Sequence, residues 1–104
     1  SGGENVASIE VEKALYAAEP KLHEVVVVGL PHERWGEAIT AVVTVREGES
    51  VDPDGVLARL RSILSPFKCP KALIVVEVMP KTATGKVQKS QIRKDLADYY
   101  RTER

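Results

Sequence analysis

The chain has 104 residues, which is enough for one domain with a modest core but few for a self-contained enzyme with a deep pocket. Fifteen Lys and Arg balance fifteen Asp and Glu, so nothing in the net charge indicates nucleic acid or an anionic membrane as a partner. The single cysteine, Cys69, excludes an internal disulfide, and no apolar run approaches the roughly 18–20 residues of a membrane span. Because the sequence starts abruptly at a glycine-rich segment, we expect it to be a piece of a longer chain.

The first half of the chain predicts a helix followed by two strands. From about Ser8, the expected N-cap, apolar residues recur at helical spacing until Pro20 ends the pattern. Residues 23–30 carry β-branched side chains on consecutive positions, which is typical of a strand covered on both faces. Residues 38–46 predict a second strand, and the turn-rich segment 31–36 favours an antiparallel hairpin.

The second half predicts a helix, a strand and a closing helix. Asp52 as N-cap and Pro53 at the first helical position indicate a helix that continues to Ser65-Pro66. A third strand is expected over residues 72–78, and an amphipathic helix over residues 90–104. Together these elements predict an α+β fold, a small three-stranded sheet flanked by about three helices, whose strand order the composition leaves open.

A short stretch after the third strand combines a proline, two threonines, a glycine and two lysines: Pro80-Lys81-Thr82-Ala83-Thr84-Gly85-Lys86. Gly85 can adopt backbone angles closed to other residues, and Lys86 is a compact charge on a flexible stem, so an exposed loop could present this cation to an anion. A phosphate-binding P-loop is excluded, because Pro80 stands where its first glycine belongs and Val87 replaces its metal-binding hydroxyl. On residue types alone, a solvated turn remains an open alternative.

Two motifs together resemble a known family. Pro80-Lys81-Thr82-x-x-Gly85-Lys86 resembles the P-K-T-x-[ST]-G-K signature of adenylate-forming enzymes, which include acyl-CoA synthetases, peptide-synthetase adenylation domains and luciferases. The opening Ser1-Gly2-Gly3-Glu4-Asn5-Val6, followed by Glu10-Val11-Glu12, resembles a second signature of that family, S-G-G-E-N-[IV] with E-[IV]-E behind it. The similarity runs along essentially the whole chain. It implies that residues 1–104 are the C-terminal mobile domain of an acyl-CoA synthetase whose large N-terminal adenylate-binding domain is absent.

The resemblance also implies roles for particular residues. Lys86 would be the catalytic lysine of carboxylate adenylation, and it would contact ATP and the acyl-adenylate together with Gly85. After domain rotation, a glycine-rich loop would line the pantetheine tunnel of coenzyme A: Gly2, Gly3, Glu4 and Asn5. Lysines at the position of Lys86 are acetylation targets in some members of the family.

For the parent enzyme, the resemblance implies an AMP-forming acid–thiol ligase of fatty acid metabolism that uses ATP, Mg²⁺ and coenzyme A. Its partners would be its own N-terminal domain, a carboxylic acid and coenzyme A, with no nucleic acid and no transmembrane segment. We expect a cytoplasmic protein, and an isolated fragment that is inactive and binds none of these cofactors tightly. Transfer to a carrier protein and a non-catalytic interaction module are the alternatives.

This chain departs from the family pattern at a few positions. Ser8 replaces a frequent proline, Phe67 replaces a common tyrosine, and Gln88-Lys89 replaces a hydrophobic residue and an arginine. Lys89 thereby loses any bidentate contact that an arginine would make. None of these changes removes a functional group on which the expected roles depend.

Other residues that could carry chemistry have simpler interpretations. His23 and His32 lack the spacing of a metal site, and Cys69 has no adjacent base that would make it nucleophilic. Trp35 could stack on a purine or cover the small core. Acidic residues are interspersed along the chain and the net charge is zero, so the basic residues near the C-terminus do not indicate nucleic-acid binding: Lys86, Lys89, Arg93 and Lys94.

Overall fold

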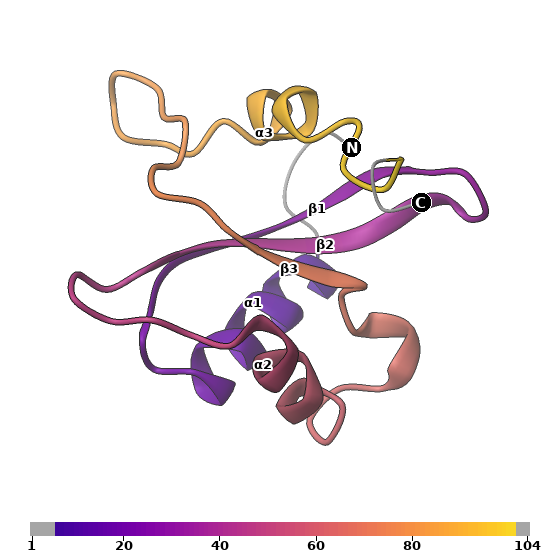
Figure 1. Cartoon of the computed structure of the whole chain (residues 1–104). Helices are drawn as coiled ribbons and strands as arrows, with labels where there is room; N and C mark the ends of the chain where they lie inside the picture. Colours follow the sequence, from indigo (N-terminus) through magenta and orange to yellow (C-terminus); the bar gives the residue numbers. More distant parts are fainter. Residues whose placement is uncertain (1–5, 102–104) are drawn as a thin grey trace.

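The computed structural model describes residues 6–101 (Figure 1). In chain order its elements are α1 (Val6–Ala18), β1 (Leu22–His32), β2 (Gly36–Val45), α2 (Pro53–Leu60), a 3-10 turn η1 (Pro66–Lys68), β3 (Ala72–Val75) and α3 (Lys89–Asp95). Three helices and three strands confirm the predicted α+β fold with a small three-stranded sheet.

The sheet has the order β1-β2-β3, which the composition left open. β1 and β2 form the expected antiparallel hairpin, with Val26 opposite Val42, and Gly36 closes the turn at a φ of 75°. β3 pairs with β2 in parallel, with Ala41 opposite Leu73. A parallel pair needs a long crossover, and α2 supplies it.

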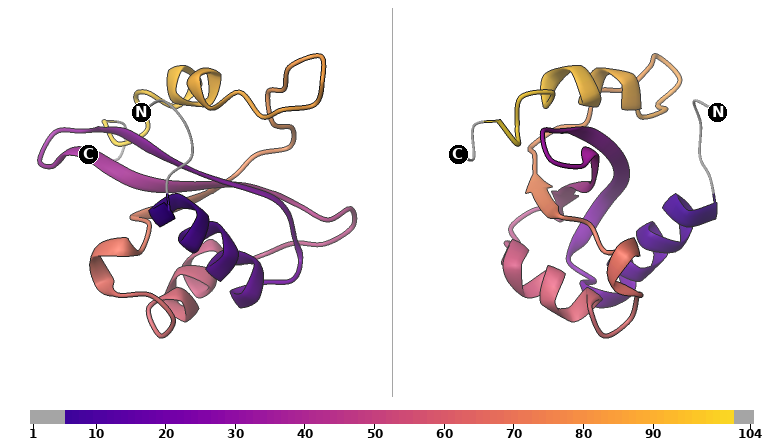
Figure 2. Two further views of the ribbon diagram at one scale, coloured as in Figure 1. Left: turned by 180° about the vertical axis from the view of Figure 1, so that it is seen from behind. Right: turned by 90° about the vertical axis from the view of Figure 1, so that its right-hand side faces the viewer.

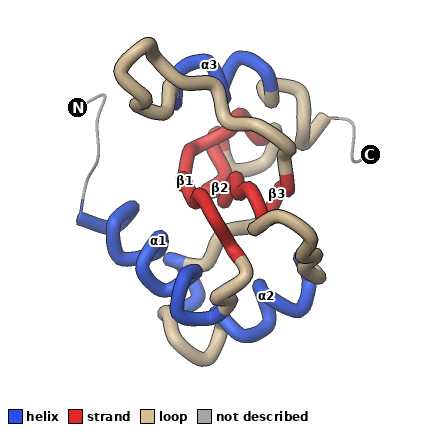
Figure 3. Tube along the Cα trace, turned by 90° about the vertical axis from the view of Figure 1, so that its left-hand side faces the viewer, coloured by secondary structure: helices blue, strands red, loops and turns tan. Residues whose placement is uncertain are grey.

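Helices cover both faces of the sheet. α1 and α2 lie on one face, while α3 and the segment before it lie on the other (Figures 2 and 3). Alternate residues of β1 serve the two layers: Val25 and Val27 belong to the core under α1 and α2, and Val26 and Val28 to the core under α3. This division explains the unbroken run of valines, since both faces of a strand buried on two sides must be apolar.

The bounds of the first two helices differ from the expectation. α1 begins at Val6, so Ser8 lies inside the helix and is not its N-cap. α2 begins as predicted, with Pro53 in its first turn and Asp52 in the N-cap position, although the Asp52 side chain makes no capping hydrogen bond. It ends at Leu60 and not at Ser65, because the amides of Ser62 and Ile63 bond three residues back and the last turn tightens.

The bounds of the last two elements are also shorter than predicted. β3 ends at Val75. The amide of Val76 still donates to the carbonyl of Val43 on β2, but Val78 is 79% exposed. α3 ends at Asp95, because the chain then turns back onto the sheet. The hydroxyl of Tyr100 there lies 2.7 Å from Thr40 Oγ1 in the core, a contact that a continuous helix over residues 90–104 would not make.

Candidate functional site

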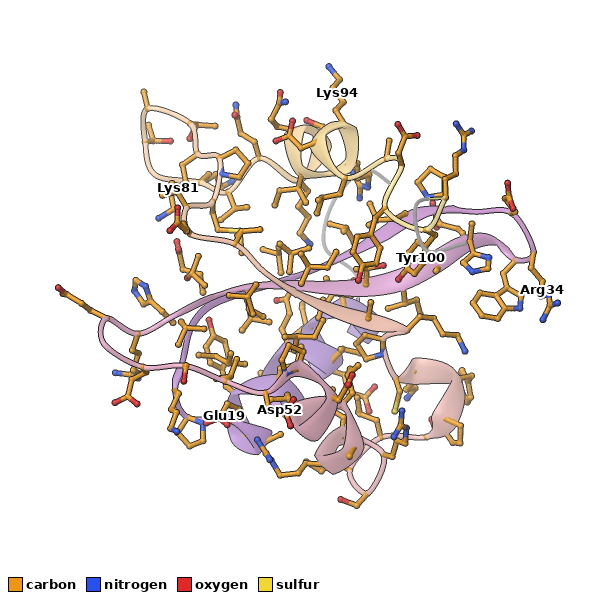
Figure 4. All side chains as sticks on the ribbon, viewed as in Figure 1. Glu19, Arg34, Asp52, Lys81, Lys94 and Tyr100 are labelled. Carbon is orange, nitrogen blue, oxygen red and sulfur yellow. The ribbon has the colours of Figure 1, made fainter. Side chains whose placement is uncertain are left out.

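The segment with the two lysines forms a loop that projects beyond the sheet, between β3 and α3. The chain is fixed on one side by Met79, which is 2% exposed, and on the other side by α3. Figure 1 shows this loop on the same face of the sheet as α3, and Figure 4 shows Lys81 at its base. The predicted exposed loop is therefore present, and it starts and ends in the core.

The backbone of the loop forms a small hairpin. Lys81 and Val87 make an antiparallel bridge, and the amide of Gln88 donates to the carbonyl of Pro80 over 2.9 Å. Inside this bridge the amide of Thr82 donates to the carbonyl of Lys86 over 2.8 Å, and the amide of Gly85 donates to the carbonyl of Thr82 over 3.0 Å. This pattern corresponds to a tight turn followed by one residue in the left-handed region, a common short hairpin connection.

Gly85 occupies the left-handed position of that turn, with a φ of 90°. A Cβ built there would meet no atom within 4 Å, so space does not require the glycine. The backbone angle does, because side chains disfavour positive φ. The glycine of the motif is thus explained by the path of the backbone.

Lys86 follows this turn with an exposed side chain. Its amide donates to Thr82 Oγ1 over 3.1 Å, and Thr82 Oγ1 also lies 3.0 Å from Thr84 Oγ1. The threonine hydroxyls therefore bind the loop's own backbone and each other. Within residues 6–101 the Lys86 ammonium group has no ion-pair partner, so a fixed backbone presents a solvated cation to whatever approaches.

The other lysine of the loop is paired. Lys81 Nζ lies 2.5 Å from Glu24 Oε2, on β1. The hydrogen bond from Lys81 lowers the pKa of the Glu24 carboxyl below its usual value, despite the opposing effect of partial burial, and Thr44 assists. Glu24 has only a weak signal in the sequence, a single carboxylate at the start of an otherwise apolar strand.

The remaining candidate residues are the glycine-rich segment and Trp35. Gly2, Gly3, Glu4 and Asn5 lie outside the described residues, so the structure does not test their proximity to Lys86. Trp35 is half exposed in the β1–β2 turn, where its ring stacks on His32 at 4.0 Å and Lys71 Nζ lies 4.6 Å from its centroid.

A cleft with a volume of about 300 Å³ lies elsewhere on the described part of the molecule, along the edge of β1. Its polar rim includes Lys68, which pairs with Glu10 at 2.8 Å, and Lys89, which lies 3.8 Å from Glu12. Gly29 also lines it, and the Glu37 side chain passes so close to Gly29 that an added Cβ would collide with it. Two of its charges are thus used in pairs that tie α1 to η1 and α3.

The described part of the chain has two further general features. No group of three or more His, Cys, Asp or Glu side chains in it is arranged to hold a metal ion. Its helices are too short and too polar to cross a bilayer.

Comparisons with known proteins agree with the geometry. The family model described as the AMP-binding enzyme C-terminal domain matches residues 10–86, so the match ends at Lys86. Indoleacetate–CoA ligase of Aromatoleum aromaticum is 41% identical over 97 residues, which are 93% of this chain and 19% of that protein.

Two solved structures show the same fold. ATP-bound MatB from Rhodopseudomonas palustris superposes with a TM-score of 0.84 at 39% identity, over 95% of this chain and 20% of that chain. An amide bond synthetase, McbA from Marinactinospora thermotolerans, superposes with a TM-score of 0.74 at 33% identity, over 84% of this chain and 17% of that chain.

This chain therefore spans about a fifth of the length of the relatives it matches. The matched range, residues 10–86, includes the sheet and ends with the glycine–lysine loop, so the fold and the loop agree with one family. The chain belongs to the AMP-binding enzyme C-terminal domain family, in the branch of the acyl-CoA synthetases and CoA ligases.

Proposed function

We propose that this chain is the C-terminal mobile domain of an ATP-dependent acyl-CoA ligase and that Lys86 is its catalytic cation. The observation that carries the proposal is the geometry of the loop: Lys86 is exposed, has no ion-pair partner within residues 6–101, and follows a hydrogen-bonded turn that ends at Gly85. A lysine that served only solubility would not need a backbone held by four internal hydrogen bonds.

The chemistry explains why a cation is wanted. In the proposed reaction a carboxylate attacks the α-phosphorus of ATP, the bond to pyrophosphate breaks, and an acyl-adenylate forms. Both reactants are negative, so the Lys86 ammonium group would offset their repulsion and stabilise the charge of the transition state. Its exposed position fits an anionic group, and Gly85 leaves open space beside it. Mg²⁺, the nucleotide and the acyl group would be held by the large domain.

In the second half-reaction the thiol of coenzyme A attacks the acyl carbon and AMP leaves. We propose that the domain then rotates and that Gly2, Gly3, Glu4 and Asn5 line the pantetheine tunnel. The similarity to an amide bond synthetase at 33% identity indicates that this fold also occurs in an enzyme named for a different acceptor. Transfer to a carrier-protein thiol and a non-catalytic interaction module are the alternatives. An assay with different acceptors distinguishes coenzyme A from a carrier protein, and a non-catalytic module would support no adenylation at all. Cytoplasmic location stays a prediction.

The first test separates the two half-reactions in the enzyme that contains this chain and its large domain. Lys86→Ala should lower acid-dependent pyrophosphate exchange by about 10²–10³-fold, the usual loss for one group that stabilises transition-state charge. Thioester formation from supplied acyl-adenylate should continue, because the loop has left the site in that step. The acceptor is identified by offering coenzyme A, an amine or a carrier protein.

The matched control is Lys94→Ala, which removes another exposed lysine, on α3. It should leave both half-reactions unchanged. Equal loss in both half-reactions for Lys86→Ala would contradict the proposed role. The 104-residue chain alone should release no pyrophosphate, and measurable release would contradict the assignment as a mobile domain.

A further inference from the structure

The orientation of the Lys86 loop depends on how its base is joined to the sheet. The loop is stiff inside, since five hydrogen bonds connect residues 80–88 to one another, and two of these form the bridge between Lys81 and Val87. Stiffness inside the hairpin does not fix its angle to the rest of the domain. That angle is set by the contacts at the base of the hairpin, so these contacts determine the position of Lys86.

One polar contact joins the loop to the sheet. Within the described residues, Lys81–Glu24 is the only ion pair or side-chain hydrogen bond between positions 81–86 and the rest of the domain. The Lys81 and Glu24 side chains are 40% and 22% exposed, so the contact lies at the rim of the core. The bridge between Lys81 and Val87 then places Lys81 next to the arm that carries Lys86.

Glu24 is itself held in place by β2. Thr44 Oγ1 donates to Glu24 Oε1 over 3.0 Å, and the Glu24 amide donates to the same hydroxyl oxygen over 3.0 Å. Thr44 is only 4% exposed, so the Glu24 carboxylate is hydrogen-bonded to a buried residue of the sheet. One carboxylate oxygen thus binds the sheet and the other binds the loop.

An irregularity of β1 aims this carboxylate at the loop. The register shifts between Leu22 and Glu24, which is a β-bulge. Leu22 belongs to the core under α1 and α2, although it lies two positions from Glu24, whose side chain reaches the opposite face. In a regular strand these two side chains would share a face, so the bulge is what allows Leu22 to be buried while Glu24 meets Lys81.

We propose that Glu24 and Lys81 are positioning residues for Lys86: their ion pair sets the angle at which the loop presents the catalytic cation. This inference rests on the proposed function of Lys86. A partly exposed ion pair contributes little to global stability. A displacement of about 1 Å at a reacting group can nevertheless lower a rate by about 10²-fold. The pair should therefore matter for adenylation far more than for folding.

The kinetic test uses the enzyme that contains this chain and its large domain. Glu24→Gln keeps the size of the side chain and an oxygen for Thr44 but removes the charge that holds Lys81. It should lower the kcat of acid-dependent pyrophosphate exchange by about tenfold. Lys81→Gln should have the same effect. The KM for the acid should change little, and thioester formation from supplied acyl-adenylate should continue at the original rate.

Two further variants make the result specific. The charge-reversed pair Glu24→Lys with Lys81→Glu should recover most of the lost rate, while each single reversal should not. The matched control is Glu19→Gln, which breaks the 2.8 Å pair with Arg59 on the opposite side of the domain and should leave pyrophosphate exchange unchanged. An unchanged kcat in Glu24→Gln and Lys81→Gln, or an equal loss in Glu19→Gln, would overturn the inference.

A second measurement separates this inference from the proposed function. In the 104-residue chain, nitrogen-15 relaxation should show lower order parameters for residues 82–86 in Glu24→Gln, with values in β1 and β2 unchanged. Unchanged order in the loop would overturn the positioning role even if Lys86→Ala inactivates adenylation. If Lys86→Ala leaves adenylation intact, the proposed function fails, whereas a loosened loop in Glu24→Gln would still establish the structural contact.

Discussion

Lys86 and Gly85 are neighbours with different roles in presenting a positive charge from the loop. Lys86 supplies the charge, and Gly85 supplies a backbone angle, a φ of 90°, that lets the hairpin close just before the lysine. The motif is therefore both a chemical and a conformational signal. This explains why a glycine stands there although a Cβ would meet no neighbouring atom.

Gly85→Ala should lower both stability and adenylation. A residue other than glycine in the left-handed region costs roughly 1–2 kcal/mol, so the loop would shift to relieve the strain and move Lys86. Urea unfolding measures the loss of stability in the 104-residue chain, and pyrophosphate exchange measures the loss of adenylation in the larger enzyme.

Gly48→Ala is the matched control for that substitution. Gly48 has a similar φ of 79° and also has no atom within 4 Å of a built Cβ, but it lies in the turn after β2. It should lose about as much stability as Gly85→Ala while adenylation stays unchanged. Comparable loss of adenylation in both variants would mean that strain, and not the position of Lys86, limits the rate.

At the scale of elements, the Glu24–Lys81 pair links the loop to β1 and should leave a signature in the pH dependence of stability. The pKa of Glu24 is lowered in the folded protein, mainly by the hydrogen bond from Lys81. A lowered folded-state pKa contributes stability above the usual value of the carboxyl, and this stability is lost as the pH falls through the lowered value. The stability difference between the original protein and Glu24→Gln should thus be constant near neutral pH and shrink once the pH drops below 4.5.

Thermal unfolding of the 104-residue chain over acidic to neutral pH measures that difference. The control repeats the comparison with Lys81→Gln in both proteins. Without the Lys81 charge, the added Glu24→Gln substitution should no longer produce the same pH-dependent difference. A difference that grows as the pH falls would contradict the sign of the shift.

Several elements followed from the sequence because their signals are local. The valine run of β1 and the Asp52-Pro53 start of α2 depend on residues next to one another, and the structure confirms both. The end of α3 did not follow, because Tyr100 leaves the helical path for a hydroxyl on β2, 60 residues away. The spacing of apolar residues over positions 90–104 indicates which side chains are buried. It does not show whether a buried residue such as Tyr100 lies in a helix or in a turn.

The candidate site divides in the same way. The exposed loop with Lys86 and Gly85 could be predicted, since motif and turn chemistry lie within seven residues. Glu24 could not, because it lies far from Lys81 along the chain and reaches it only through a bulge in β1. The positions of Gly2 to Asn5 stay predictions.

At the scale of the whole molecule, one sheet separates two cores. Leu15 is fully buried on the α1 side and Leu30 is fully buried on the α3 side. Alternate residues of β1 and β2 contribute to both cores. Because the two cores share these strands, one core cannot unfold while the sheet of the other stays folded. The domain should therefore unfold in a single step, as small domains usually do.

Leu15→Ala and Leu30→Ala test this coupling. Each should reduce the free energy of unfolding by about 2–5 kcal/mol, because a buried leucine leaves a cavity. Trp35 fluorescence and far-ultraviolet circular dichroism should report coincident urea transitions in both variants. Ile63→Ala, at a position 51% exposed, should have a much smaller effect. Two separate transitions would show that the cores are independent.

The sequence alone determined the composition of the layers, the loop that carries Lys86 and the family to which both motifs point. These are properties of neighbouring residues, and local spacing and chemistry record them. The tertiary structure alone decided the strand order, the turn that returns Tyr100 to the sheet and the pairing of Lys81 with Glu24. Each of these joins segments distant in sequence, and their meeting depends on how the whole chain packs, which no local pattern encodes.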